Sequence, residues 1–195
     1  RSYNPVHLSM PAQQLPSSAS IIVVGGGVMG ASSAYHLALA GTKQVLLLES
    51  EPFFGQGATG RCAGGVRYQF GTEVNVRLSI ESLGMLERFR EETGQDPQYR
   101  KCGYLFALTQ PADVQAFQHN REMQRSLGVQ VEWLEGEEVR RRLPSMRLPD
   151  ALAGTYHALD GLADPHSVVM GYVQRARQLG ATVLSEARVS GVEVD

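Results

Sequence analysis

Two periodicities of apolar residues succeed one another along the chain, and together they predict an α/β protein. Short runs rich in Val, Ile and Leu are typical of buried strands, whereas apolar positions spaced by three or four residues indicate helices. The predicted strands cover residues 20–24, 44–48, 103–108, 129–134, 182–184 and 187–194, with a weaker strand signal at 153–157. The predicted helices cover residues 28–40, 72–92, 111–127, 137–143 and 165–179. The first three elements form a βαβ unit of about 30 residues, the length of a right-handed crossover.

Local signals mark several of the helix ends. Thr109 and Asp164 each stand shortly before a proline and are predicted to cap the helices that follow. Glycines at positions 41, 94 and 180 suit the left-handed backbone at a helix C-terminus. The helix over 72–92 is expected to turn one apolar side to the core, made of Leu78, Met85, Leu86 and Phe89. The first 19 residues are expected to form a flexible tail.

Composition excludes several classes of protein. The 195 residues include 18 Lys plus Arg and 20 Asp plus Glu, so the net charge of −2 gives no basis for nucleic-acid binding. The 43% hydrophobic content is enough for a sizeable core. The uncharged stretch 20–40 is interrupted by four glycines, which argues against a transmembrane segment. Because Cys62 and Cys102 cannot make a disulfide framework, we expect a reducing compartment and a cytoplasmic protein.

The strongest local motif is a G-x-G-x-x-G between the first strand and the first helix. In this pattern Gly25 permits a tight turn, Gly27 lets the backbone approach a pyrophosphate, and Gly30 lets the helix pack closely on the strand. The phosphates would face the helix N-terminus, where free N–H groups and the helix dipole favour negative charge.

An acidic residue follows at the spacing that a dinucleotide requires. Glu49 ends the second strand, 19 residues after Gly30, where a carboxylate can accept hydrogen bonds from a ribose. Alone, Glu49 is equally well explained as a solvated glutamate at a strand end. Together with the glycines it predicts dinucleotide binding, and its charge disfavours the 2′-phosphate of NADP.

A glycine-rich segment then takes the place of the next helix. Residues 54–71 hold six glycines in 18 positions and predict neither helix nor strand. Backbone with few side chains suits close approach to a large flat ligand. The alternative is a flexible surface loop, against which its length and its two arginines argue.

Four separated motifs together resemble a known family. They are residues 25–30, Glu49, residues 57–67 and the run Asp-Gly-Leu-Ala-Asp-Pro at 160–165. In this order they resemble FAD-dependent amine and amino-acid oxidoreductases of the D-amino-acid oxidase fold family, in the branch of sarcosine oxidase β and proline dehydrogenase β subunits. The resemblance covers residues 20–195 and corresponds to the N-terminal half of such proteins.

The resemblance implies a fold and a division into domains. A Rossmann-like FAD-binding domain of the glutathione-reductase type would be interleaved with an α+β substrate domain. Residues 20–95 and 160–195 would belong to the FAD-binding domain, and residues 96–159 to part of the substrate domain. The implied partners are the C-terminal half that completes the fold, further subunits and a small amine or amino acid.

The same resemblance implies roles for individual residues. Gly25, Gly27 and Gly30 would hold the pyrophosphate and Glu49 the adenosine ribose, while Val189 would give backbone contacts to adenine. The flavin end would be lined by Gln56, Ala58, Thr59, Arg61, Gly64, Gly65 and Val66. The cofactor-binding set is completed by Val28, Met29, Ser50 and Cys62. Arg67 would bind the substrate carboxylate, because a guanidinium matches a carboxylate bidentately, although an exposed arginine or a structural ion pair is the alternative.

Arg61 and Cys62 stand next to each other near the expected flavin end. In dimethylglycine and sarcosine dehydrogenases the position of Arg61 is a histidine bonded covalently to FAD, so attachment at this site is expected to be non-covalent. Cys62 is either a redox thiol or, as single cysteines more commonly are, a small buried hydrophobe. The histidines, including His157, have no partner at metal-ligand spacing, so no metal site is predicted.

The implied reaction is oxidation of a C–N bond. The substrate would be a secondary amine or amino acid of the sarcosine, proline or N-methyl amino-acid class, and hydride would pass to flavin N5. Two alternatives stay open. One is an FAD-binding assembly or scaffold protein without a main catalytic role, which Arg67 disfavours, and the other is an NAD-dependent dehydrogenase.

Overall fold

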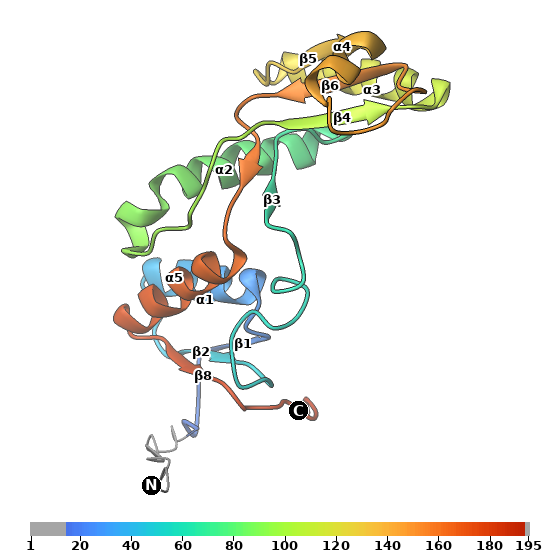
Figure 1. The fold of residues 1–195 in the computed structure, drawn as a ribbon. Helices are drawn as coiled ribbons and strands as arrows, with labels where there is room; N and C mark the ends of the chain where they lie inside the picture. Colours follow the sequence, from blue (N-terminus) through green and yellow to red (C-terminus); the bar gives the residue numbers. More distant parts are fainter. Residues whose placement is uncertain (1–14, 194–195) are drawn as a thin grey trace, which may run out of the picture.

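The computed structural model describes residues 15–193, so most of the tail expected over residues 1–19 lies outside the described residues. Within that range no helix has the length and apolarity needed to cross a membrane. Figure 1 shows two sheets, one at each end of the molecule, with a long helix between them. In chain order the elements are β1 Ile21–Val24, α1 Val28–Leu39, β2 Val45–Leu48, β3 Gly65–Val66, α2 Glu73–Thr93, β4 Tyr104–Leu108, α3 Pro111–Ser126, β5 Glu132–Glu135, α4 Gly136–Arg142, β6 Ala153–His157, β7 Gly161–Leu162, α5 Pro165–Gln178 and β8 Thr182–Leu184.

The first sheet is parallel, in the order β1-β2-β8. Leu47 in the central strand pairs with Val23 on one side and Val183 on the other, and all four residues of β2 are buried. Burial on both faces explains why this strand is a continuous apolar run. Helices α1 and α5 pack side by side on one face of the sheet, and the Tyr35 and Tyr172 rings meet there at 5.3 Å.

Helix α2 connects the two sheets and buries different sides along its length. Its first half packs through Val76 against the end of α3, and its second half packs through Phe89 against α5. The Phe89 ring lies edge-on to Tyr172 at 4.9 Å, and Gly171 makes room for it, since a Cβ there would come within 2.4 Å of the ring. Leu78 was expected to face the core, and that expectation was wrong. It is 59% exposed, because the single apolar side assumed from the sequence does not match a helix that packs on two partners in turn.

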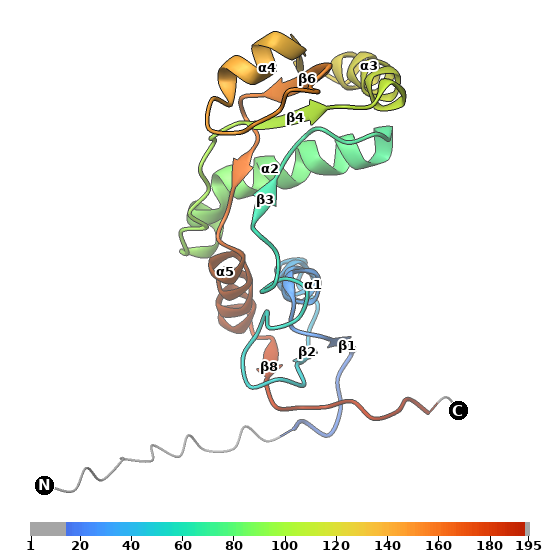
Figure 2. The ribbon, with the colours of Figure 1, turned by 45° about the vertical axis from the view of Figure 1, so that its right-hand side comes forward.

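The second sheet is antiparallel, in the order β4-β6-β5. Thr155 in the central strand pairs with Phe106 and Trp133 on its two sides. Helix α4 covers one face, where Val139 is fully buried, and α3 lies on the other, where Phe117 meets Phe106 at 5.4 Å. Figures 1 and 2 show both helices at the end of the molecule opposite the parallel sheet.

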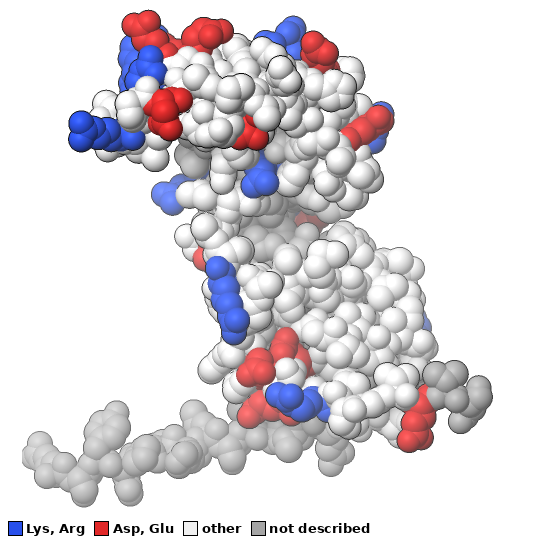
Figure 3. Space-filling view, turned by 90° about the vertical axis from the view of Figure 1, so that its right-hand side faces the viewer, with Lys and Arg blue, Asp and Glu red and all other residues white. Residues whose placement is uncertain are grey.

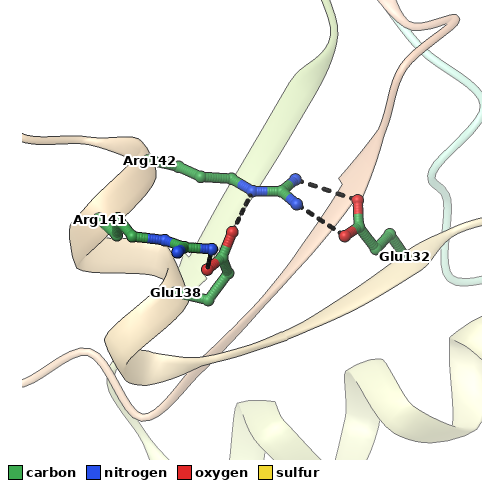
Figure 4. A network of polar contacts seen from close by, with 4 residues as sticks. All are labelled: Glu132, Glu138, Arg141 and Arg142. Carbon is green, nitrogen blue, oxygen red and sulfur yellow. Dashed lines mark hydrogen bonds and ion pairs between the residues drawn. The ribbon is translucent and has the colours of Figure 1, made fainter.

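A network of ion pairs joins α4 to β5 (Figure 4). Arg142 donates two hydrogen bonds to Glu132, at 2.7 and 3.0 Å, and a third to Glu138 at 2.7 Å, while Arg141 also contacts Glu138. Hydrogen bonding to Arg142 holds the pKa of Glu138 below its ordinary value. Because the groups are partly exposed, we assign this network a role in orienting α4 rather than a large share of the stability.

The two sheets are also linked by a short antiparallel pair, β3 with β7. Gly65 pairs with Leu162, and Val66 with Gly161. The backbone at Arg100 also packs directly against β7 and requires glycine there, because a Cβ at Gly161 would lie 1.9 Å from the Arg100 carbonyl oxygen. Figure 2 shows β3 and α2 between the two bulkier ends of the molecule. In the space-filling view of Figure 3 the middle is narrower than the ends, and charged side chains of both signs are scattered over the face shown.

Several sequence expectations differ from the structure at element ends. Both two-residue strands, β3 and β7, were missed, because a pair this short leaves no periodic pattern. The N-cap of α3 is Gln110 rather than Thr109, and the expected Asp164 cap of α5 is confirmed, accepting from Ser167 N at 2.7 Å. No strand forms over residues 187–193, the described part of the strand expected at 187–194. Glu186 has a φ of 56°, which ends the extended backbone, and within residues 15–193 no strand runs alongside to pair with this segment.

Candidate cofactor and substrate site

The glycine motif forms the turn that the sequence predicts at the end of β1. Gly25 has a φ of +101° and donates its N–H to the Leu48 carbonyl at 2.8 Å. Gly30 lies in the first turn of α1, directly on this backbone, and a Cβ there would lie 1.8 Å from the Gly25 oxygen. Both positions therefore require glycine, one for its conformation and the other for contact.

The N-terminus of α1 opens toward the following loop. Gly27 is the N-cap and has no side chain with which to cap the helix. Instead, the hydroxyl of Thr59 accepts a hydrogen bond from Val28 N at 3.1 Å. The first N–H groups of a helix lack intrahelical acceptors and carry the positive end of the helix dipole. Together with Thr59 they form a cradle for an anionic group, and Met29 beside them is 79% exposed.

Glu49 is held against this turn as an ionised carboxylate. It is 9% exposed, and its oxygens accept from Gly26 N at 2.6 Å, Glu51 N at 2.9 Å and Ser50 Oγ at 3.2 Å. Burial alone would raise the pKa of Glu49, but the hydrogen bonds from Glu51, Gly26 and Ser50 outweigh it, so the pKa lies below its ordinary value. Glu49 is thus not the freely solvated strand-end glutamate of the alternative interpretation.

The chain after β8 returns to the same place. Ala187 N donates to the Glu49 carbonyl at 2.8 Å, and Glu186 N donates to the Glu51 carbonyl at 3.1 Å. Val189 follows two residues later and is 37% exposed. The structure therefore brings the segment expected to contact adenine next to the residue expected to contact the ribose.

The loop over residues 54–64 is built of consecutive turns beside the α1 N-terminus. Gly55 N donates to the Gly26 carbonyl at 3.0 Å, which fixes the start of the loop to the glycine turn. Four residues expected at the flavin end are exposed here: Gln56, Ala58, Arg61 and Cys62. The expectation of a buried Cys62 was wrong. Its thiol lies on the surface and donates to the Thr59 carbonyl at 3.0 Å, because this loop has no layer of structure over it within the described residues.

The loop ends where its backbone bonds to the Asp-Gly-Leu-Ala-Asp-Pro motif at residues 160–165. Ala163 N donates to the Gly64 carbonyl at 2.9 Å, and the Gly64 φ is +74°. A Cβ at Gly64 would lie 2.2 Å from the Ala163 oxygen. Gly65 and Val66 then form β3, so two motifs about 100 residues apart meet through backbone contacts.

Arg67 directly follows β3, and its side chain lies against the antiparallel sheet. Its Nε donates to the Gln69 carbonyl at 3.3 Å. Its guanidinium lies over the Phe70 ring at 4.6 Å, the Phe106 ring at 5.5 Å and the Tyr104 ring at 5.7 Å. Cation–π contacts of this kind hold an arginine in place without neutralising it. Arg67 is thus only partly exposed and makes no ion pair within residues 15–193, unlike the exposed or ion-paired arginine of the alternative interpretation.

A buried carboxylate beside Arg67 has no counterpart among the predicted site residues. Asp160 is fully buried, and its oxygens accept from Tyr68 N at 2.8 Å and Gln69 Nε2 at 3.0 Å and face His157 Nδ1 at 2.8 Å. Its partner His157, at the end of β6, is 6% exposed. The sequence signal for this pair is the His-x-x-Asp spacing at the end of a weakly predicted strand, and the predicted set of site residues did not include it.

Within residues 15–193 no three His, Cys, Asp or Glu side chains come together as a metal site. The glycine turn, the helix N-terminus, Glu49 and the glycine-rich loop lie together in the arrangement expected of a dinucleotide-binding site. The residues fit FAD on structural grounds, because Gly27 adds no side chain at the α1 N-terminus, where a pyrophosphate would lie beside Thr59, and the ionised Glu49 is bound to the same turn.

Comparison with known proteins agrees with this class. Residues 20–195 match the family described as FAD dependent oxidoreductase. The chain belongs to this family, whose members are enzymes with FAD as cofactor. The NAD-dependent alternative is not favoured by this membership.

Several of the similar proteins carry the names of amine or amino-acid oxidoreductases. It is 32% identical over 181 residues to mitochondrial dimethylglycine dehydrogenase of Homo sapiens, covering 92% of this chain and 21% of that protein. It is 29% identical to 4-methylaminobutanoate oxidase (formaldehyde-forming) of Paenarthrobacter nicotinovorans, covering 91% of this chain and 22% of that protein. The solved L-proline dehydrogenase from P. horikoshii superposes with a TM-score of 0.83 at 32% identity, covering 93% of this chain and 47% of that one. The chain thus spans about a fifth of these curated relatives and about half of the solved structure.

Proposed function

We propose that the protein oxidises the C–N bond of a secondary amine or amino acid of the sarcosine, proline or N-methyl amino-acid class. FAD, when bound, supplies the two-electron chemistry by accepting a hydride at N5. The single observation that supports a substrate with a carboxylate is Arg67, a half-buried cation that donates to the Gln69 carbonyl and lies among three aromatic rings. The names of the relatives support the same class of substrate.

The residues of this chain would divide the work between the two ends of the site. The α1 N-terminus with Thr59 would hold the pyrophosphate, and Glu49 the ribose. Arg67 would bind the substrate carboxylate bidentately through its terminal nitrogens, since the bond to Gln69 uses only Nε. Holding the carboxylate orients the carbon next to the nitrogen, and no general base is needed when that carbon loses a hydride.

We infer that the two sheets correspond to the two interleaved domains expected from the sequence. The parallel sheet with α1 and α5 is built from residues of segments 20–95 and 160–195. The antiparallel sheet with α3 and α4 is built from residues of segment 96–159. Arg67, on the first segment, contacts Tyr104 and Phe106 of the second, so the substrate would bind where the two domains meet.

The test is an anaerobic absorbance titration of the intact FAD-loaded protein with sarcosine, L-proline, N,N-dimethylglycine and 4-methylaminobutanoate. We expect one of them to bleach the flavin band near 450 nm in a saturable manner, and the decarboxylated amine of the same substrate to do so at least about tenfold more weakly. A flavin spectrum that none of these compounds changes would contradict the proposal and favour an assembly or scaffold role.

A further inference from the structure

Asp160 has the environment of a structural organiser placed beside a proposed substrate-binding arginine. The carboxylate is fully buried and receives the Tyr68 N–H and one Gln69 side-chain N–H, while His157 Nδ1 lies 2.8 Å from the same Oδ1 that Tyr68 contacts. Two N–H donors, together with the ring nitrogen of His157, satisfy the hydrogen bonding of this carboxylate without contact with solvent. Tyr68 and Gln69, which donate these two hydrogen bonds to Asp160, follow Arg67 directly in the sequence.

The contacts continue from Asp160 to the guanidinium in two steps. Gln69 Nε2 donates to Asp160 Oδ2 at 3.0 Å and also to the Tyr104 carbonyl at 3.0 Å. These two bonds hold the Gln69 side chain between Asp160 and β4. The Gln69 carbonyl in turn accepts from Arg67 Nε at 3.3 Å. Moving Gln69 therefore moves the one hydrogen-bond acceptor described for Arg67.

The aromatic side of the same arginine depends on the same residues. Tyr104, whose ring lies under the guanidinium, pairs across the sheet with His157, and Tyr68 contacts the His157 ring edge-on at 5.0 Å. The backbone carbonyl of Asp160 also accepts a hydrogen bond at 2.8 Å from the N–H of Gly103, the residue directly before Tyr104. Asp160 therefore contacts both Gln69, whose carbonyl accepts from Arg67, and the residue before Tyr104, whose ring lies under the guanidinium.

We propose that Asp160, paired with His157, is a positioning residue that sets the angle at which Arg67 meets a substrate carboxylate. This inference rests on the proposed function, because it assigns Asp160 a purpose in carboxylate recognition. Asp160 touches no reacting atom and acts only through Gln69 and Arg67.

The substitution Asp160→Asn tests this role with little change in volume. The introduced amide cannot satisfy all of its neighbours, because its NH2 would face either the Gln69 NH2 or the backbone N–H of Tyr68. If the Gln69 amide turns over, its oxygen meets the Tyr104 carbonyl instead. Each arrangement displaces Gln69 or Tyr68, the two residues that follow Arg67, so we expect the affinity for a carboxylate ligand to fall about tenfold.

The measurement is a difference-absorbance titration of the intact, oxidised, FAD-loaded protein with pyrrole-2-carboxylate, and with pyrrole as the probe lacking the carboxylate. Asp160→Asn is combined with Arg67→Ala in a double-mutant cycle. We expect Asp160→Asn to weaken the carboxylate about tenfold in the unaltered background and less than about twofold when Arg67 is already Ala. Asp164→Asn, a matched change in the same motif that keeps an oxygen for the α5 cap, is expected to leave the dissociation constant unchanged.

The outcomes separate this inference from the function on which it rests. If the Asp160→Asn loss is equal in both backgrounds, or affects pyrrole as much as the carboxylate, Asp160 is merely structural and the inference fails. If Arg67→Ala itself leaves carboxylate affinity unchanged, or the unaltered protein does not bind the carboxylate, Arg67 is not the carboxylate site and both fail. Melting temperatures of all variants show whether each is folded under the conditions of the titration.

Discussion

The carboxylate of Glu49 accepts a hydrogen bond from the backbone N–H of Gly26 at 2.6 Å, so the acid at the end of β2 is fastened to the turn at the end of β1. This bond gives Glu49 two functions at once. It fixes the geometry of the glycine turn, and it keeps a negative charge at the edge where we propose that the ribose binds. A Cβ at Gly26 would lie 3.0 Å from the Glu49 side chain and 2.4 Å from Phe54, so the contact depends on glycine.

Replacing this acid is predicted to affect both stability and cofactor binding. Glu49→Gln keeps the size of the side chain but puts an amide NH2 where one of the backbone donors now points. We expect unfolding free energy to fall by about 1–3 kcal/mol and FAD affinity to fall at least about tenfold, measured by urea denaturation and by flavin fluorescence on release. Glu51→Gln is the control, because the Glu51 side chain is exposed and makes only weak polar contacts to Ser50 and Arg188. Equal behaviour of the two variants would contradict this role for Glu49.

The pKa of Glu49 also predicts how stability depends on pH. Hydrogen bonds hold this pKa below its ordinary value despite burial, so the ionised form stabilises the folded state. That contribution is complete above the unfolded pKa of about 4.3 and is lost as pH falls through the folded pKa. The difference in unfolding free energy between the unaltered protein and Glu49→Gln should therefore be constant above about pH 5.5 and shrink at lower pH. A difference that stays constant down to pH 3 would show that Glu49 is not ionised in this way.

The parts of the fold and the site that depend on one stretch of chain can be predicted from the sequence. The turn with Gly25 and Gly30, the α5 cap at Asp164 and the buried strand β2 follow from local conformation and hydrophobicity, which neighbouring residues determine. The family resemblance added the order of the motifs. The roles assigned to individual cofactor-binding residues stay predictions.

What the sequence did not reveal depends on contacts between distant segments. The Asp160 carboxylate is satisfied by Tyr68 and Gln69, which are more than 90 residues away, so no local pattern marks it. Strand β3 consists of two residues and exists only because β7 lies beside it. Likewise, the exposure of Leu78 follows from α2 packing on two different partners, which a single helical period cannot show.

The packing of α1 on the glycine turn predicts a steep difference between two similar substitutions. Gly30→Ala would place a methyl group 1.8 Å from the Gly25 carbonyl oxygen, and the helix can relieve that only by moving away from the turn. We expect a loss of at least about 2 kcal/mol of stability together with loss of bound FAD. Gly57→Ala lies in the neighbouring loop, and among residues 15–193 nothing beyond its two chain neighbours comes within 4 Å of the added methyl group, so its effect should stay within about 0.5 kcal/mol. Thermal unfolding and the flavin-to-protein absorbance ratio of the purified variants measure both effects.

Thr59 is predicted to act at the pyrophosphate. Its hydroxyl accepts from Val28 N at 3.1 Å, and the same hydroxyl has a proton that it can donate to a phosphate oxygen at the α1 N-terminus. Thr59→Val keeps the shape and removes both interactions, so we expect the dissociation constant for FAD to rise about five- to twentyfold. Thr59→Ser retains the hydroxyl and should restore affinity to within about twofold of the unaltered protein. The readout is the equilibrium dissociation constant from flavin fluorescence, which does not depend on turnover. If valine and serine at this position bind FAD equally well, the hydroxyl plays no part at the pyrophosphate, and the backbone N–H groups of α1 hold it alone.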